Sequence, residues 1–153
     1  MFLAKKYYLT TGVGVDEYEI ASFDKALMDA GLSEYNLVKV SSIIPPFAKQ
    51  CMFVDSTPGS ILFTAYSQIA TKKDEIIASA IVAAIPNENN YTGVIMEYSC
   101  LGSKEKALGV ARQLAADAMY RRKVNDYRMI DKCIEATGTS GLTTTTFCAI
   151  ALM

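Results

Sequence analysis

The chain has 153 residues, 51% of them hydrophobic, so we expect a single domain over residues 1–153 with one sizeable core. Its net charge is −1, with 15 basic and 16 acidic residues and no basic stripe, so a nucleic-acid partner is not expected. The first fifteen residues suit neither a signal sequence nor a membrane span. The four cysteines form no CxxC pair, which favours free thiols in a reducing cytoplasm.

The chain contains no histidine. This excludes Ser–His and Cys–His catalysis and leaves the scattered cysteines without the usual partners of a zinc site, so no metal is expected. Proton transfer must therefore use a carboxylate, tyrosine, lysine or cysteine, or a cofactor.

The spacing of apolar residues predicts two helices among several strands. Ser22 is the expected N-cap of the first helix, and Gly31 its stop. Strands interrupted by two separated helices favour an α+β sandwich. The predicted elements are strands over residues 6–15, 36–44, 61–69, 91–98, 129–136 and 142–152, helices over 23–30 and 103–123, and a segment over 75–85 that is either helix or buried strand.

Two adjacent serines, Ser41 and Ser42, interrupt an apolar strand pattern just before Pro45 and Pro46. A serine held rigidly against its preceding carbonyl can attack it and break the chain, and the resulting ester can eliminate to leave a pyruvoyl group. Such a ketone acts as an electron sink in place of pyridoxal phosphate. A serine pair is more often only a solvated strand end, but the stiff double proline favours a strained scissile bond.

Three other residues have a chemical and a simpler interpretation. Glu97 lies among apolar strand residues, where burial would raise its pKa and make it a proton donor; the alternative is a strand-end charge paired with a base. The Asn36 amide could hold an oxyanion, although asparagine at a strand start is more often a turn residue. Asp24 could bind a guanidinium through paired hydrogen bonds, or be an exposed helix charge.

The segment NLVKVSSIIPP at residues 36–46 closely resembles the self-processing segment of the pyruvoyl-dependent arginine decarboxylases. The joint order of the similar segments is more specific than any one of them, and the likeness covers nearly the whole chain. The other segments are SFDKAL at 22–27, IASAIVAAIP at 77–86, GVIMEY at 93–98 and FCAIA at 147–151.

The resemblance implies a four-layer αββα sandwich that is self-cleaved between Ser41 and Ser42. The products would be a short chain, 1–41, and a long chain, 42–153, whose first residue becomes a covalently bound pyruvoyl group. Neither pyridoxal phosphate nor a metal is implied, and the family assembles as a homotrimer with sites between neighbouring protomers.

The resemblance also implies roles for four further residues. Asn36 matches the asparagine that assists processing, and Glu97 matches the glutamate that donates a proton. Asp24 and Ile20 match residues that contact the guanidinium of the substrate.

The implied reaction converts L-arginine to agmatine and CO2, in polyamine synthesis or in acid tolerance. The chain differs from the family at Ser33, Glu34 and Tyr35, where the family often has small residues near the guanidinium. One alternative is therefore the same chemistry on another amino acid, such as histidine or ornithine. A second is an uncleaved, non-catalytic homologue acting as an interaction module. A pyridoxal-phosphate enzyme is the weakest alternative, because the chain is short and shows no phosphate cradle.

Overall fold

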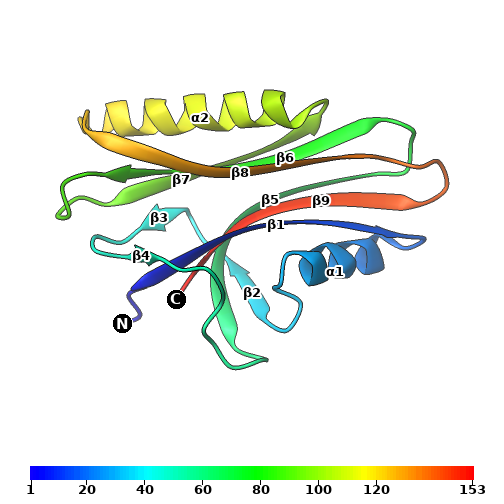
Figure 1. Cartoon of the computed structure of the whole chain (residues 1–153), viewed down its shortest axis with the longest axis horizontal. Helices are drawn as coiled ribbons and strands as arrows, with labels where there is room; N and C mark the ends of the chain where they lie inside the picture. Colours follow the sequence, from blue (N-terminus) through cyan, green and yellow to red (C-terminus); the bar gives the residue numbers. More distant parts are fainter.

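The computed structural model describes all residues from 1 to 153 and contains two helices and two β-sheets. Figure 1 shows the order of the layers: helix α2, the sheet that contains β6, the sheet that contains β9, and helix α1. The elements are β1 (Lys6–Asp16), α1 (Glu19–Asp29), β2 (Asn36–Lys39), β3 (Ile43–Ile44), β4 (Lys49–Gln50), β5 (Ile61–Thr71), β6 (Ile76–Pro86), β7 (Gly93–Leu101), α2 (Lys104–Arg121), β8 (Tyr127–Thr137) and β9 (Thr143–Leu152).

The two sheets are predominantly antiparallel. The first has the strand order β2-β5-β9-β1-β4 and the second β3-β7-β6-β8, with parallel pairing only between β1 and β4 and between β2 and β5. Strands β2 and β3 follow each other in the chain but lie in different sheets, each at an edge. The segment between Lys39 and Ile43 therefore crosses from one sheet to the other.

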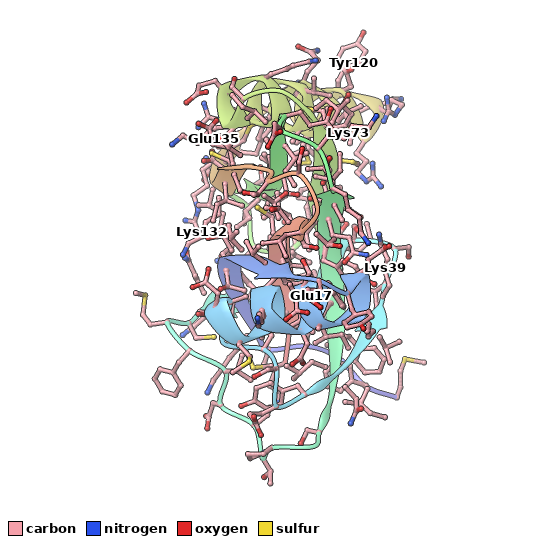
Figure 2. All side chains as sticks on the ribbon, turned by 90° about the vertical axis from the view of Figure 1, so that its right-hand side faces the viewer. Glu17, Lys39, Lys73, Tyr120, Lys132 and Glu135 are labelled. Carbon is pink, nitrogen blue, oxygen red and sulfur yellow. The ribbon has the colours of Figure 1, made fainter.

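Three apolar clusters separate the layers. One lies between the sheets and includes Tyr7, Ile81 and Ile150. The second packs α2 on its sheet through a row of fully buried alanines, whose small side chains permit a close approach. The third packs α1 on the other sheet around Phe147. Figure 2 shows the same stack of layers from the side.

Most predicted elements are confirmed to within a few residues, and the ambiguous segment over 75–85 is strand β6. Ile81 and Ala83 of β6 face the other sheet, whereas Ala80 and Val82 face α2. A strand covered on both faces is apolar along its whole length, so its pattern does not alternate.

The predicted start of the first helix is wrong. Helix α1 begins at Glu19, and Ser22 lies inside it, fully buried, rather than capping it. Its Oγ donates to the Gly14 carbonyl oxygen (3.0 Å) and shares a hydrogen bond with Thr145 Oγ1 (2.6 Å). These tertiary contacts outweigh the preference of serine for a cap. The predicted stop is confirmed, since Gly31 follows the helix with φ of 71°.

The single strand predicted over residues 36–44 is also wrong, because it is divided into β2 and β3. Ser42 has φ of 66°, a left-handed conformation that no extended strand can contain. The two-residue strand β4 was not predicted, since two residues are too short to give a periodic signal.

Candidate active site

The serine pair lies at the crossing between the two sheets. The amide of Ile95 donates to the Ser42 carbonyl oxygen (2.8 Å), and β3 then pairs with β7 through Ile43 and Val94. These bonds hold Ser42 in its left-handed conformation, which costs a residue with a Cβ roughly 1–2 kcal/mol. The backbone at the predicted scissile pair is therefore strained by the way the chain changes sheets.

Glu97 projects from β7 towards this crossing. Ile95 packs between the sheets, and because strand side chains alternate, Glu97 two residues later faces the same way. Ser42 Oγ donates to Glu97 Oε2 (3.2 Å) and lies 3.4 Å from Oε1. The structure thus brings together two residues that are 55 positions apart in the chain.

Burial raises the pKa of the Glu97 carboxyl above its ordinary value of 4.5. The hydrogen bond from Ser42 and the positive charge of Lys39 act in the opposite direction, but desolvation is the larger effect. A carboxyl group in this environment keeps its proton to higher pH than an exposed one, as a proton donor requires.

Two hollows meet at the serine pair. One, which we call the Glu97 hollow, has a volume of about 360 Å³ and is lined by both serines, Glu97, apolar residues of β3 and β7, and Arg122. The other has about 320 Å³, is also lined by both serines and is walled mainly by apolar residues, including Phe2 and Phe63. Small molecules can therefore reach Ser42.

Asn36 does not contact the serine pair within this chain. It begins β2, its Nδ2 donates to the Gly59 carbonyl oxygen (2.9 Å), and its side chain is exposed. At about 3.3 Å per residue, β2 separates Asn36 from Lys39 by roughly 10 Å, and the serines follow beyond Lys39.

Asp24 and Ile20 lie one turn apart on the exposed side of α1, with Ile20 77% exposed. Helix α1 packs on β1 and β9, on the outer face of the sheet that does not contain Glu97. Within one chain, five of the six predicted site residues therefore form two groups: Ser41, Ser42 and Glu97 together, and Asp24 with Ile20 on another layer. Asn36 belongs to neither group.

Two cationic residues near the site were not predicted. Arg122, the C-cap of α2, lines the Glu97 hollow. The positive charge of Lys39 partly opposes the rise in the pKa of Glu97. The Nζ atom of Lys39 is 4.7 Å from the centroid of the Tyr66 ring. Figure 2 shows Lys39 at the flank of the stacked layers. No sequence signal identifies either residue, because their positions depend on how distant strands and helices meet.

Neither helix is both long and apolar enough to cross a membrane. No group of three or more His, Cys, Asp or Glu side chains lies close enough together to hold a metal ion.

Comparison with known proteins identifies the family. Residues 6–153 match the family model described as pyruvoyl-dependent arginine decarboxylase. The chain belongs to this family. Its serine pair, Glu97 and the hollow that they line fit a family that depends on a pyruvoyl group, since they place a strained serine against a half-buried carboxyl.

Curated relatives carry the same family name. The chain is 36% identical over 115 residues to the pyruvoyl-dependent arginine decarboxylase of Methanococcus vannielii, and the alignment covers 74% of this chain and 70% of that protein. The proteins of the same name from Methanococcus aeolicus and Thermoplasma volcanium are 35% identical over 130 residues and 32% identical over 150 residues. These alignments cover 84% and 87% of this chain, and 79% and 82% of the respective relatives.

Proposed function

We propose that this protein is a self-processing enzyme that converts L-arginine to agmatine and CO2, using a pyruvoyl group made from its own Ser42. The observation that carries the proposal is the contact between Ser42 Oγ and the half-buried Glu97 carboxyl, at a residue of left-handed backbone and beside an open hollow. The family membership and the names of the relatives support the substrate.

The processing step uses only this chain and water. Ser42 Oγ attacks the carbonyl carbon of Ser41, the C–N bond between the two residues breaks, and an ester forms. Elimination then breaks the Cβ–Oγ bond of residue 42, which leaves a carboxylate on Ser41 and dehydroalanine at position 42. Hydrolysis of the dehydroalanine releases ammonia and leaves the pyruvoyl group. The strain at Ser42 favours this reaction, because cleavage releases it.

A pyruvoyl ketone supplies an electrophilic carbonyl that withdraws electrons from an attached amino acid as its carboxylate is lost. The residues of this chain do the rest. Glu97, whose raised pKa favours the protonated form, donates the proton that replaces CO2 on the α carbon. Apolar side chains of β3 and β7 line the part of the hollow in which the reacting atoms would lie.

The positions of Asp24 and Ile20 support an assembly of cleaved protomers. Both lie on the exposed side of α1, on a different layer from Glu97, so a site that uses all three residues needs a neighbouring copy. In a cytoplasmic homotrimer, α1 of one protomer would bind the guanidinium while its neighbour supplies Ser42 and Glu97. Asn36, exposed at the start of β2, would assist processing in the assembled state.

The direct test is the release of CO2 from a panel of arginine, ornithine and histidine. We expect arginine to be the preferred substrate, Glu97→Gln to abolish turnover without preventing cleavage, and Asp24→Asn to raise the KM for arginine strongly. The control is Glu17→Gln, at an exposed carboxylate with no side-chain hydrogen bond, and it should change neither turnover nor the KM for arginine. Preference for ornithine or histidine would overturn the substrate, and an uncleaved, inactive wild-type protein would support an interaction module instead.

A further inference from the structure

We propose that Arg122 forms a subsite for the α-carboxylate of the substrate in the Glu97 hollow. This inference rests on the proposed function and assigns a role to a residue that neither the sequence pattern nor the resemblance singled out.

The guanidinium of Arg122 is available for a ligand. Its Nη1 donates to the Ala118 carbonyl oxygen (3.1 Å), which ties the side chain to the last turn of α2. None of the three ion pairs in the structure includes Arg122, so its positive charge has no carboxylate partner. Arginine has five N–H donors, and the bond to Ala118 uses one of them.

Arg122 is also the only cationic residue that lines this hollow. Its other walls are hydroxyl groups, apolar side chains and the carboxyl of Glu97. Lys39 influences Glu97 through its charge, but its ammonium group lies over the Tyr66 ring and Lys39 does not line the hollow.

The chemistry of the substrate places a carboxylate in this hollow. The amino group of an amino acid must reach the atom that derives from Ser42, and the carboxylate is attached to the same carbon as that amino group. It therefore enters the hollow together with the reacting nitrogen. A guanidinium can hold a carboxylate through two parallel hydrogen bonds, which fixes the plane of the carboxylate as well as its position.

The matched pair of ligands for the test is arginine and agmatine, which differ only in the carboxylate. Arg122→Gln keeps an N–H donor for the Ala118 carbonyl oxygen but removes the charge. We expect it to raise the KM for arginine roughly five- to thirtyfold, the range between an exposed ion pair and a well-formed charged hydrogen bond. The inhibition constant of agmatine should stay within about twofold, because agmatine has no group for Arg122 to bind.

Two further variants separate a binding role from a structural one. Arg122→Lys keeps the charge and should recover part of the affinity for arginine. Arg121→Gln removes a neighbouring charge that does not line the hollow and should change neither constant. Self-cleavage, measured on a denaturing gel, reports whether each variant folds.

Equal weakening of arginine and agmatine in Arg122→Gln would overturn the inference, because it would mean that Arg122 only maintains the shape of the site. An unchanged KM for arginine would overturn it as well. In both cases the wild-type protein would still decarboxylate arginine, so the proposed function would be unaffected. A wild-type protein that never decarboxylates arginine would instead overturn the proposed function, and the subsite with it.

Discussion

Replacement of Gly14 by alanine is expected to displace α1 from its sheet while leaving Ser42 and Glu97 in place. A Cβ at position 14 would overlap the Ser22 carbonyl oxygen and lie 2.5 Å from the Ala26 nitrogen. Real Cβ atoms essentially never approach other atoms within 3.0 Å, so α1 must move by more than the difference between 2.5 and 3.0 Å, because the Ser22 carbonyl oxygen lies closer still than the Ala26 nitrogen.

The displacement of α1 determines both the loss of stability and the loss of affinity for arginine. Overpacking of this kind costs about 1–3 kcal/mol, which corresponds to a fall in Tm of roughly 3–10 °C for a chain of this size. Because α1 carries Asp24, a misplacement approaching 1 Å should also raise the KM for arginine by about 10- to 100-fold. Cleavage between Ser41 and Ser42 should persist, since α1 does not form the crossing between the sheets.

Thermal unfolding, steady-state kinetics and a denaturing gel measure these three effects separately. Gly109→Ala is the matched control, because Gly109 is exposed in α2 and a Cβ there would meet nothing within 4 Å. It should raise Tm slightly, through the better helix propensity of alanine. An unchanged KM and Tm in Gly14→Ala would refute the close packing of α1 on β1, and a loss of cleavage would refute the separation of the two groups of site residues.

Two further predictions concern pH. The pKa of Glu97 is raised in the folded state, so its contribution to stability is present below its ordinary pKa of 4.5 and is lost as pH rises through the folded value. The Ser42→Ala, Glu97→Gln double variant should therefore have a higher Tm at pH 7 than Ser42→Ala alone, and should lose this advantage below pH 4.5. A Tm difference between the two variants that is the same at every pH would argue against burial of the Glu97 charge. The pKa of Asp74 is lowered, because Ser140 donates to it from its Oγ (2.6 Å) and its backbone nitrogen (2.9 Å). This stabilisation is present above the ordinary pKa of 3.8 and is lost as pH falls through the lower folded value. Asp74→Asn should therefore lower Tm at pH 7, and the loss of Tm relative to the wild-type protein should become smaller in acid. An equal loss of Tm at every pH would contradict the lowered pKa of Asp74.

The sequence predicts the elements whose local signals agree with their surroundings. Helix α2 has alanines at helical spacing, a serine that caps it, since Ser103 Oγ accepts from the Lys106 amide (3.3 Å), and a basic end. Ser22 shows the limit of such signals. Its preference for an N-cap is overridden by a buried contact with Thr145, 123 positions away, which no local pattern encodes.

The site is predictable in part for the same reason. A carboxylate among apolar strand residues signals burial, and the pKa of Glu97 is raised as expected. The change of sheet at Ser42 could not be predicted, because residues 36–44 have the continuous pattern of one strand. Arg122 could not be found either, since its place in the hollow depends on where the end of α2 meets β7.

Intact mass spectrometry of freshly purified, denatured wild-type protein is the most direct test of whether Ser42 becomes a pyruvoyl group. We predict two species, residues 1–41 and residues 42–153, with the longer one lighter by one ammonia than the same fragment beginning with serine. Ser42→Ala should give a single uncut chain. A wild-type preparation that decarboxylates arginine while every molecule remains an unbroken chain of 153 residues would contradict the proposal.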